Sequence, residues 1–259
     1  MLKRSLILTW LAAAALCGQA QNVVFDFDSA PVHSPLPISL TVGGITANFS
    51  ATGSGFSIQA ANTLGFTPVG FAGNCIYPNS IGAADLLVSF SQPLTSFAIL
   101  YAPQELGCDS SARMRVTAYM DSILVGTATT NASVPGTWPT EWLRYSSGTG
   151  FNRVVVHYDA PPACQDYGPI FMADNMEVVP APPPIVLSGA AKLADGSFQF
   201  FFTNSPGASC RVWSTTNVSQ AMTNWGLAGT PMEQVPGTYM FTEPVSADPG
   251  PRFYRVTSP

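Results

Sequence analysis

Short alternations of apolar and polar residues run along most of the chain and predict β-strands. The segment 112–120 is the clearest case, because Met114, Val116 and Ala118 alternate with arginine, threonine and tyrosine, which places the two kinds of side chain on opposite faces of a strand. Segments rich in Gly, Pro, Asn and Ser separate such runs, and no long stretch keeps the period of an amphipathic helix. About ten short strands with turns between them are typical of a jelly roll or another β-sandwich.

A proline-rich stretch divides the chain into two such regions. Residues 180–184 read PAPPP, a composition that forms a stiff, extended linker. Residues 21–179 before it are predicted to form the jelly-roll β-sandwich. Residues 185–259 after it are predicted to form a smaller, immunoglobulin-like β-sandwich, in which Phe198 and Phe200 alternate onto one face of a strand. The predicted fold class is therefore all-β in both domains.

The N-terminal residues 1–20 have the pattern of a secretory signal peptide. Lys3 and Arg4 form the charged region, an apolar run extends to Cys17, and a small-x-small cleavage site ends at Ala20. We expect cleavage after Ala20 and a secreted or outer-surface location for the mature protein. No later segment reaches the length of a membrane span, so no span is expected after cleavage.

The chain is acidic and poor in charged residues. It has 10 Lys+Arg and 15 Asp+Glu, and without Lys3 and Arg4 the net charge is 8 − 15 = −7. Only 10% of its residues are charged, whereas an average soluble protein has about 25%. Nucleic acids and anionic lipid surfaces attract basic patches, so neither is an expected partner.

Four cysteines remain after cleavage, and two of them are candidates for a disulfide. Export permits disulfides, and we predict a bond between Cys108 and Cys164, which lie in polar loops that follow strands. Cys75 is the alternative partner, because spacing alone does not fix connectivity. A zinc site is not expected, since the chain has no C-x-x-C pair and only 2 histidines.

The usual sequence signatures of catalysis are missing. The chain has no G-x-S-x-G segment, phosphate-binding loop or H-E-x-x-H helix. His33 and His157 have no nucleophile partner by motif, and His157 reads as a strand-surface residue. Asp26 and Asp28 lie about 7 Å apart along one strand face; this leaves a glycosidase pair open, but turn capping or calcium ligation is the better interpretation. We predict no catalytic and no cofactor-binding residues.

The segment IFMADNMEVV, residues 170–179, places a carboxylate among core positions. A buried, ionised carboxylate needs partners, which are backbone N–H groups, a cation, or both. If the first and last strands of the sandwich meet, Asp174 lies near Asp26 and Asp28, and the three are candidate ligands of a structural calcium ion. The alternatives are a backbone cap without a metal and an exposed, incidental aspartate. The alternation places Asp174 on the same face of the predicted strand as Ile170, Met172, Met176 and Val178.

One segment carries a signal for sugar binding. The sequence VPGTWPTEWLRY, residues 134–145, places Trp138 in a proline-flanked loop, where an exposed, rigid ring can stack on the face of a sugar. Trp138 is therefore the candidate ligand-binding residue. Trp142 stands at the start of a strand and is expected in the core.

The C-terminal part of the chain resembles a known family. Residues 201–259, with FFTNSPGASC, STN followed by NW, and the closing FYRV, resemble a C-terminal β-module of exported proteins from environmental Gram-negative bacteria. The resemblance implies a terminal surface or sorting module without chemistry. Cys210 stands where that family has a bulky apolar residue, so we expect a buried free thiol there.

The N-terminal part has a second resemblance. Residues 22–179, with VVFDFD, SFSQPLTSFAILYA and ADNMEV, are similar to jelly-roll "anchor-domain" ectodomains of exported bacterial proteins and, more loosely, to carbohydrate-binding modules. In carbohydrate-binding jelly rolls an aspartate of the last strand ligates a structural calcium ion together with groups near the first strand. This resemblance implies the same role for Asp174.

The sequence thus favours a secreted or cell-surface, non-enzymatic β-sandwich protein that binds glycan or matrix material. Two alternatives remain open: a structural spacer without a small ligand, and a polysaccharide-active enzyme built on a jelly roll. An exposed aromatic pair in a groove would favour the first interpretation and a surface without a cleft the second. An acidic pair across a cleft would favour the third.

Overall fold

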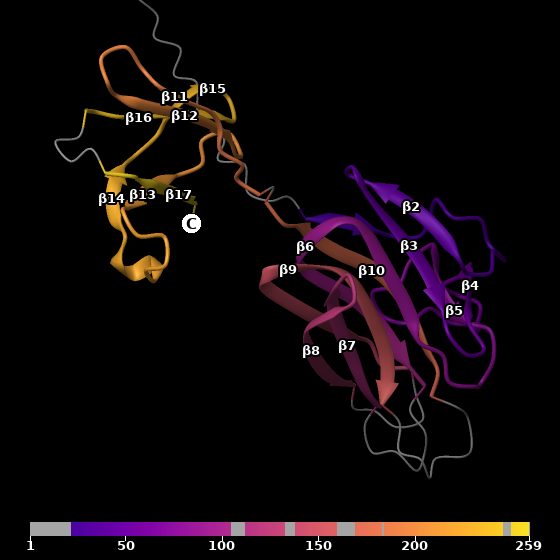
Figure 1. The fold of residues 1–259 in the computed structure, drawn as a ribbon. Coiled ribbons are helices and arrows are strands. Elements are labelled where there is room, and N and C mark those ends of the chain that lie inside the picture. Colours follow the sequence, from indigo (N-terminus) through magenta and orange to yellow (C-terminus); the bar gives the residue numbers. More distant parts are fainter. Residues whose placement is uncertain are drawn as a thin grey trace, which may run out of the picture. The chain divides into compact units, whose positions relative to one another are not determined.

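A computed structural model describes residues 22–104, 112–132, 138–159, 169–182, 184–245 and 250–258. The chain divides into two compact units, and the boundary between Ala181 and Pro182 falls inside the stretch predicted as a linker. Both units are built from β-strands (Figure 1). The predicted signal peptide, Cys108 and Cys164 lie outside the described residues, so export and the disulfide stay predictions.

The N-terminal unit is an all-β sandwich, as the alternation predicts. Buried and more exposed side chains alternate along Ile45–Ala51 and along residues 86–90, which is the pattern of a sheet with one face in a core. Residues 97–103 and 171–174 are instead buried on both faces. All its neighbouring strands pair antiparallel. The strands are β1 (Val23–Phe25), β2 (Ile38–Val42), β3 (Ile45–Ala51), β4 (Phe56–Ala60), β5 (Asn74–Pro78), β6 (Leu86–Pro103), β7 (Ala112–Met120), β8 (Ile123–Ala132), β9 (Glu141–Asp159) and β10 (Phe171–Pro180).

Two long strands, β6 and β9, each take part in both layers of the sandwich. The first half of β6 pairs with β3 and with the second half of β9, and the second half of β6 pairs with β10 and with the first half of β9. The pairing of β6 with β9 shifts register between Ser89 and Ser96. We call the layer with β2, β3, β7 and β8 the first layer, and the layer with β1, β4, β5 and β10 the second layer.

The alternation predicts separate strands over 86–91 and 97–102, and over 142–146 and 151–158. The structure has a single strand in place of each pair, β6 and β9. Pro93 interrupts the apolar pattern of β6, but it lies inside the register shift, where the loss of its N–H group removes no regular ladder bond. Gly150 has φ 73° at the corresponding place in β9, a conformation that glycine adopts without steric cost. The polypeptide therefore changes layer within one strand, at a local irregularity and without a loop.

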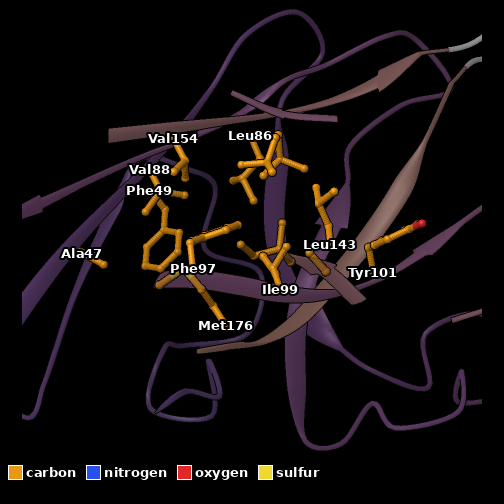
Figure 2. Packing of buried hydrophobic residues seen from close by; sticks show 14 of the residues in the cluster. Ala47, Phe49, Leu86, Val88, Phe97, Ile99, Tyr101, Leu143, Val154 and Met176 are labelled. Atoms are coloured by element: carbon orange, nitrogen blue, oxygen red, sulfur yellow. The ribbon is translucent and has the colours of Figure 1, made fainter. Parts of the chain in front are cut away.

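The main core lies between the two layers (Figure 2). Leu86, Val88 and Val154 enter it from the first layer, and Phe97 and Ile99 from the second. All five are 0% exposed. Burying a side chain of this size contributes about 1.5–3 kcal/mol relative to exposure. The core therefore fixes both layers, and with them the positions of the side chains on their outer faces.

The C-terminal unit, residues 182–259, consists of two small sheets around a core of its own. The strand orders are β11-β12-β16-β15 and β14-β13-β17. Phe200 and Phe202 are 1% exposed, and Cys210 is a buried free thiol, as predicted. No helix among the described residues is long and apolar enough to cross a membrane. The elements are β11 (Ser188–Lys192), β12 (Phe198–Thr203), β13 (Arg211–Thr215), the 3-10 helix η1 (Met222–Asn224), β14 (Gly226–Gly229), β15 (Met232–Val235), β16 (Thr238–Glu243) and β17 (Phe253–Thr257).

The segment TNSPGAS between β12 and β13 is a turn held by side chains of the neighbouring strands. The Tyr239 hydroxyl donates to the Ser205 carbonyl at 2.9 Å and accepts the Ala208 N–H at 2.7 Å. Gly207, with φ 72°, donates its N–H to the Glu233 carboxylate at 3.2 Å. The motif that stands out in the sequence is thus explained by the packing of a turn.

Candidate functional site

A β-bulge in β10 decides where its side chains point. The pairing of β10 with β6 shifts register between Asp174 and Glu177, and Asn175 has φ 49°. Before the bulge, Met172 and Asp174 lie on the outer face of the second layer; after it, Met176 points into the main core. The prediction that strict alternation places Met172 and Met176 on the same face is therefore wrong, because an extra residue reverses the alternation.

Asp174 is 1% exposed, and backbone N–H groups donate hydrogen bonds to its carboxylate. Its Oδ2 accepts the Ala72 N–H at 3.0 Å, and its Oδ1 accepts the Asn175 N–H at 2.7 Å. The Asn175 amide donates in turn to the Gly70 carbonyl at 3.0 Å. Burial raises the pKa of Asp174 to about 7, against the effect of the two backbone donors. The negative charges of Asp28 and Asp26 raise it further.

Asp26 and Asp28 follow β1, which pairs with β10 and so brings the first and last strands together. Asp28 Oδ1 accepts the Asn74 N–H at 2.6 Å, and Asp26 Oδ1 accepts the Asp28 N–H at 3.2 Å. A Cβ atom on Gly73 would lie 1.8 Å from Asp28 Oδ1, so only glycine fits there. Two carboxylates, of Asp28 and Asp174, thus fasten the same loop to the strands beneath it.

Calcium favours oxygen ligands such as these carboxylates and carbonyls. However, Asp26 Oδ1, Asp28 Oδ1 and both carboxylate oxygens of Asp174 already accept backbone N–H groups. Among the described residues, no group of three or more His, Cys, Asp or Glu side chains converges closely enough to hold a metal ion. The positions described are those of a backbone cap, and calcium binding stays a prediction.

The loop fastened by Asp174 contributes Ala61 and Phe71 to a small apolar cluster, which we call the outer cluster. It lies on the outer face of the second layer, and burial raises the pKa of its free thiol, Cys75, to about 12. A thiol with so high a pKa stays protonated and inert. The members of the outer cluster are Ala61, Phe71, Cys75, Leu100, Ala102 and Met172.

Trp138 and Trp142 both pack, half-buried, against the outer cluster. Trp142 was expected in the core, and it lies instead on the outer face of β9, where the Arg144 guanidinium carbon is 4.6 Å from the centre of its ring. Arg144 also approaches Glu177, at 3.9 Å. Trp138 uses part of its ring for packing, and its role as a sugar platform stays a prediction.

The outer face of the first layer is different, because polar side chains occupy it. The register of β7 with β9 places Arg115 opposite His157 and Tyr119 opposite Arg153. The inward positions of both strands are apolar and buried. This outer surface, which we call the polar face, is formed by Thr52, Asp85, Arg113, Arg115, Tyr119, Arg153, His157 and Asp159, with Leu87, Thr117 and Val155 in its centre.

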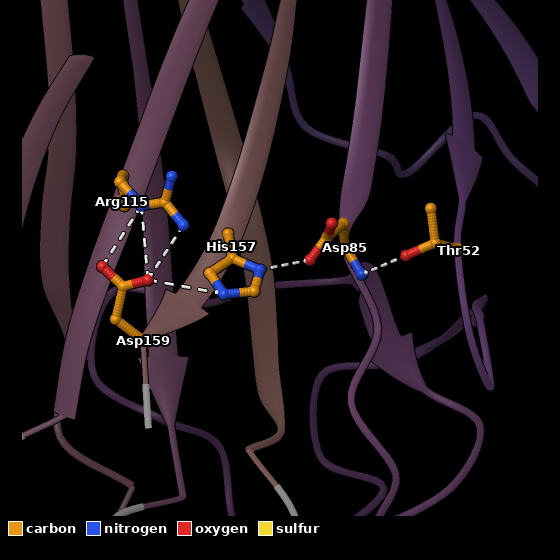
Figure 3. A network of polar contacts seen from close by, with 5 residues as sticks. All are labelled: Thr52, Asp85, Arg115, His157 and Asp159. Atoms are coloured by element: carbon orange, nitrogen blue, oxygen red, sulfur yellow. Dashed lines mark hydrogen bonds and ion pairs between the residues drawn. The ribbon is translucent and has the colours of Figure 1, made fainter. Parts of the chain in front are cut away.

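A chain of polar contacts crosses the polar face (Figure 3). Arg115 Nε lies 3.2 Å from each oxygen of Asp159, and its Nη2 lies 3.0 Å from Oδ1. His157 Nε2 is 3.4 Å from Asp159 Oδ1, and His157 Nδ1 is 2.5 Å from Asp85 Oδ1. The Asp85 N–H donates to Thr52 Oγ1 at 2.9 Å. Both nitrogens of the His157 ring therefore face a carboxylate, and the ring is oriented from both sides.

This chain remains accessible to solvent. The side chains of Arg115, His157, Asp85 and Asp159 are 38%, 37%, 30% and 30% exposed. Hydrogen bonding to Asp159 raises the pKa of Arg115, so its guanidinium stays charged. The arrangement provides fixed donors, fixed acceptors and a fixed positive charge on a rigid sheet.

An aromatic ring lies at one end of the polar face. The Arg153 guanidinium carbon is 4.4 Å from the centre of the Tyr119 ring, a distance at which the ring and the cation attract each other. Between this pair and the chain of contacts lie Val155 and Leu87, which are only half-buried. The polar face thus combines an apolar centre with polar groups around it.

The sequence pattern predicts only part of the polar face. The alternation in 112–120 correctly puts Arg113, Arg115 and Tyr119 on one outward face, and His157 is on a strand surface as predicted. The contact of His157 with Asp85 was missed, because Asp85 directly precedes another strand, β6, and its position depends on the register of β6 with β9. The contact with Asp159, two residues along β9, was missed as well.

Comparison with known proteins adds only weak structural similarity. No family model and no curated protein matches the chain. The K2 cleaved adhesin domain of Lys-gingipain is 10% identical, with a TM-score of 0.42, and the match covers 61% of this chain and 99% of that one. The N-terminal CBM22 tandem of Xyn10C from Paenibacillus barcinonensis is 10% identical, with a TM-score of 0.36 and coverage of 94% and 92%.

A third similar structure is the glycoside hydrolase domain of Endo-D from Streptococcus pneumoniae R6. It is 10% identical, with a TM-score of 0.34, and the match covers 92% of this chain and 43% of that one. The similar structures thus include an adhesin domain, carbohydrate-binding modules and a catalytic domain. Similarities of this size establish neither a shared ligand nor a shared activity.

Proposed function

We propose that this is an exported, non-enzymatic polysaccharide-binding protein and that the polar face holds the glycan. The observation that carries the proposal is the chain from Arg115 through Asp159 and His157 to Asp85, whose members are oriented by one another and remain about one-third exposed. A site whose groups are already in place loses little conformational entropy when a ligand binds.

The chemistry of the polar face suits a sugar. Hydroxyl groups both donate and accept hydrogen bonds, and here the carboxylates of Asp85 and Asp159 accept while the Arg115 guanidinium donates. The C–H face of a sugar ring is apolar, and it finds Tyr119 and Val155 beside these groups. Apolar contact and convergent polar groups are the two components of a small-ligand site.

The proposal includes no turnover of the glycan. Glycoside hydrolysis needs two carboxyl groups that face the scissile bond from opposite sides. Asp85 and Asp159 instead flank the same imidazole ring, and Asp159 is also bound by Arg115. Robust release of reducing sugar from any bound polysaccharide, lost in Asp159→Asn, would overturn this part.

The experiment is a glycan array followed by affinity electrophoresis in gels that contain each positive polysaccharide. The mature protein, residues 21–259, is compared with Tyr119→Ala and with Trp138→Ala, which tests the site expected from the sequence. We expect retardation of the wild type, and loss of about 1–3 kcal/mol of binding in Tyr119→Ala, because the ring is a contact for the sugar.

Trp138→Ala serves as the matched control, since it removes an aromatic ring from the other layer. It should bind like the wild type. Failure of the wild type to bind any polysaccharide would overturn the proposed function, and loss of binding only in Trp138→Ala would move the site to the outer cluster. Melting curves of all three proteins must coincide to within a few degrees for the comparison to hold.

A further inference from the structure

The basic residues of the N-terminal unit are concentrated on the polar face. Residues 21–181 contain four arginines and no lysine, against eleven aspartates and glutamates. Arg113, Arg115 and Arg153 all lie on the outward side of β7 and β9. The fourth, Arg144, lies on the second layer beside Trp142. An acidic unit thus places three of its four positive side chains on one surface.

Two of these three arginines form no ion pair with a residue that the structure describes. Asp159 holds Arg115. Arg113 is exposed and forms no ion pair with a described residue, although it lies opposite Asp159 in the sheet. Arg153 stacks on Tyr119, and its Nε is buried without a hydrogen-bond partner among the described residues.

The other charged groups nearby that the structure describes already have hydrogen-bond partners. Asp85 faces His157, and Asp121, at the end of β7, exchanges hydrogen bonds of 2.7 Å with Asn152. Within the described part of the chain, no carboxylate therefore pairs with Arg113 or Arg153, so their guanidinium groups can meet a ligand that carries negative charge.

The three arginines follow the direction of the strands. Arg113 and Arg115 are two residues apart on β7, about 7 Å along the strand. Arg153 is level with Tyr119, four residues beyond Arg115, which adds about 13 Å. Positive charge is thus distributed over about 20 Å of an open surface. This distribution matches an extended polymer with repeated negative groups better than a single small anion.

The protein itself contains an example of the expected contact. The Asp159 carboxylate sits against two nitrogens of the Arg115 guanidinium, at 3.0 and 3.2 Å. The planar guanidinium group fits a carboxylate in this forked geometry, and arginine is for this reason the usual residue for recognition of carboxylates. Arg113, two residues away, can hold a carboxylate of a ligand in the same way.

We propose that the polar face recognises an anionic polysaccharide in which the charged groups are carboxylates, that is, a polyuronate. This inference rests on the proposed function and specifies its ligand class. The arginines bind the carboxylates of successive uronic acids, while Tyr119 and Val155 contact the ring faces between them. At physiological ionic strength the Debye length is about 8 Å, so the acidic remainder of the protein does not cancel these short-range contacts.

The experiment compares polysaccharides that differ only in charge. Polygalacturonate and alginate are used next to their carboxyl-reduced forms, in which each carboxylate is replaced by a hydroxymethyl group, and dextran sulfate is the anionic control. Binding of the mature protein, residues 21–259, is measured by calorimetry at 0.15 M salt and again at 1 M salt. We expect at least one polyuronate to bind about tenfold more tightly than its reduced form, because each charged hydrogen bond adds to the affinity, and to lose affinity at 1 M salt.

Three variants locate the effect. Arg113→Gln, at an exposed position where folding is not at risk, and Arg153→Gln should each weaken binding of the polyuronate about tenfold and change binding of the reduced polymer little. Arg144→Gln, the matched control on the other layer, should bind like the wild type. Melting curves verify the fold of each variant.

Each other outcome has a distinct meaning. Equal affinity for the polyuronates and their reduced forms overturns the ligand class but leaves polysaccharide binding in place. Tighter binding of dextran sulfate than of any polyuronate overturns the assignment to carboxylates. Absence of binding to all of these polymers, together with a negative glycan array, overturns the proposed function itself. An effect of Arg144→Gln as large as that of Arg113→Gln overturns the placement on the polar face.

Discussion

The two outer faces of the N-terminal sandwich use carboxylates in opposite ways. On the second layer, Asp174 is 1% exposed and its oxygens accept backbone N–H groups. On the first layer, the side chain of Asp159 is 30% exposed and contacts Arg115 and His157. A carboxylate held by the main chain fixes a loop, whereas a carboxylate held by side chains leaves a charged surface open to solvent.

The two outer faces also differ in the amount of apolar side chain that they carry. The outer cluster is apolar, and it includes Met172 of β10 and Phe71 of the loop that Asp174 fastens. The polar face has Val155 and Leu87 as half-buried apolar side chains in its centre, with polar and charged side chains around them. One face therefore serves stability, and the other is available for binding.

The largest effect is expected for removal of the buried carboxylate. Asp174→Ala leaves the Ala72 and Asn175 N–H groups without their acceptor, and we expect the free energy of unfolding at pH 6 to fall by about 3 kcal/mol. Urea denaturation measures it. The matched control, Asp159→Ala, removes a carboxylate that is 30% exposed and should cost about 1 kcal/mol or less. Equal losses in both variants would remove the contrast between the two faces.

A second effect follows from the raised pKa of Asp174, which is about 7 in the folded protein and about 3.9 in an unfolded chain. Between these values the folded state binds more protons than the unfolded state, so stability falls as the pH rises. The contribution is complete below pH 3.9 and is lost above pH 7. From pH 5 to pH 8 we expect a loss of about 2–3 kcal/mol that is absent in Asp174→Asn. The same pH dependence in wild type and variant would assign it to another group.

On the polar face the expected effect is on binding and not on stability. Asp159→Asn keeps the shape of the side chain but removes the charge that orients Arg115 and His157. We expect the stability to change by about 1 kcal/mol or less and the affinity for the bound polysaccharide to fall about tenfold. A variant that binds normally would show that the orientation of Arg115 does not matter for the ligand.

The smallest expected effect concerns calcium. The backbone cap around Asp174 predicts that EGTA leaves the melting temperature unchanged, whereas the calcium site expected from the sequence requires it to fall, because a bound ion stabilises the folded state. Melting curves with and without EGTA, each repeated for Asp28→Asn, decide between them. A decrease with EGTA in the wild type but not in Asp28→Asn would establish the metal site.

The sequence correctly predicted features that depend only on the alternation of residues within one strand. The alternation in 112–120 places Arg113 and Arg115 outward, and the position of Asp174 among apolar residues indicates a buried carboxylate. Both inferences use the period of two that any strand imposes. They need no knowledge of which strand is the neighbour.

The sequence did not predict features that depend on how two strands are aligned with each other. The contact of His157 with Asp85 depends on the register of β9 with β6, and no local pattern encodes it. The bulge at Asn175, a residue with positive φ, reverses the faces of β10. Asparagine adopts positive φ more readily than most residues, but its presence in a strand does not by itself predict a bulge. The placement of Trp142 on an outer face follows from the same limit, because either face of β9 could have been the inner one.

The pairing of β1 with β10 also has a mechanical consequence. Val23 lies opposite Val178, and β10 ends at Pro180, so the polypeptide enters and leaves the N-terminal unit at the same end of adjacent antiparallel strands. A force that pulls these two ends apart loads the hydrogen bonds between β1 and β10 one after another, as in opening a zipper. Strands pulled from opposite ends would instead share the load among all their bonds at once. Under tension β1 is therefore the first strand to detach, before the remaining strands of the sandwich are strained.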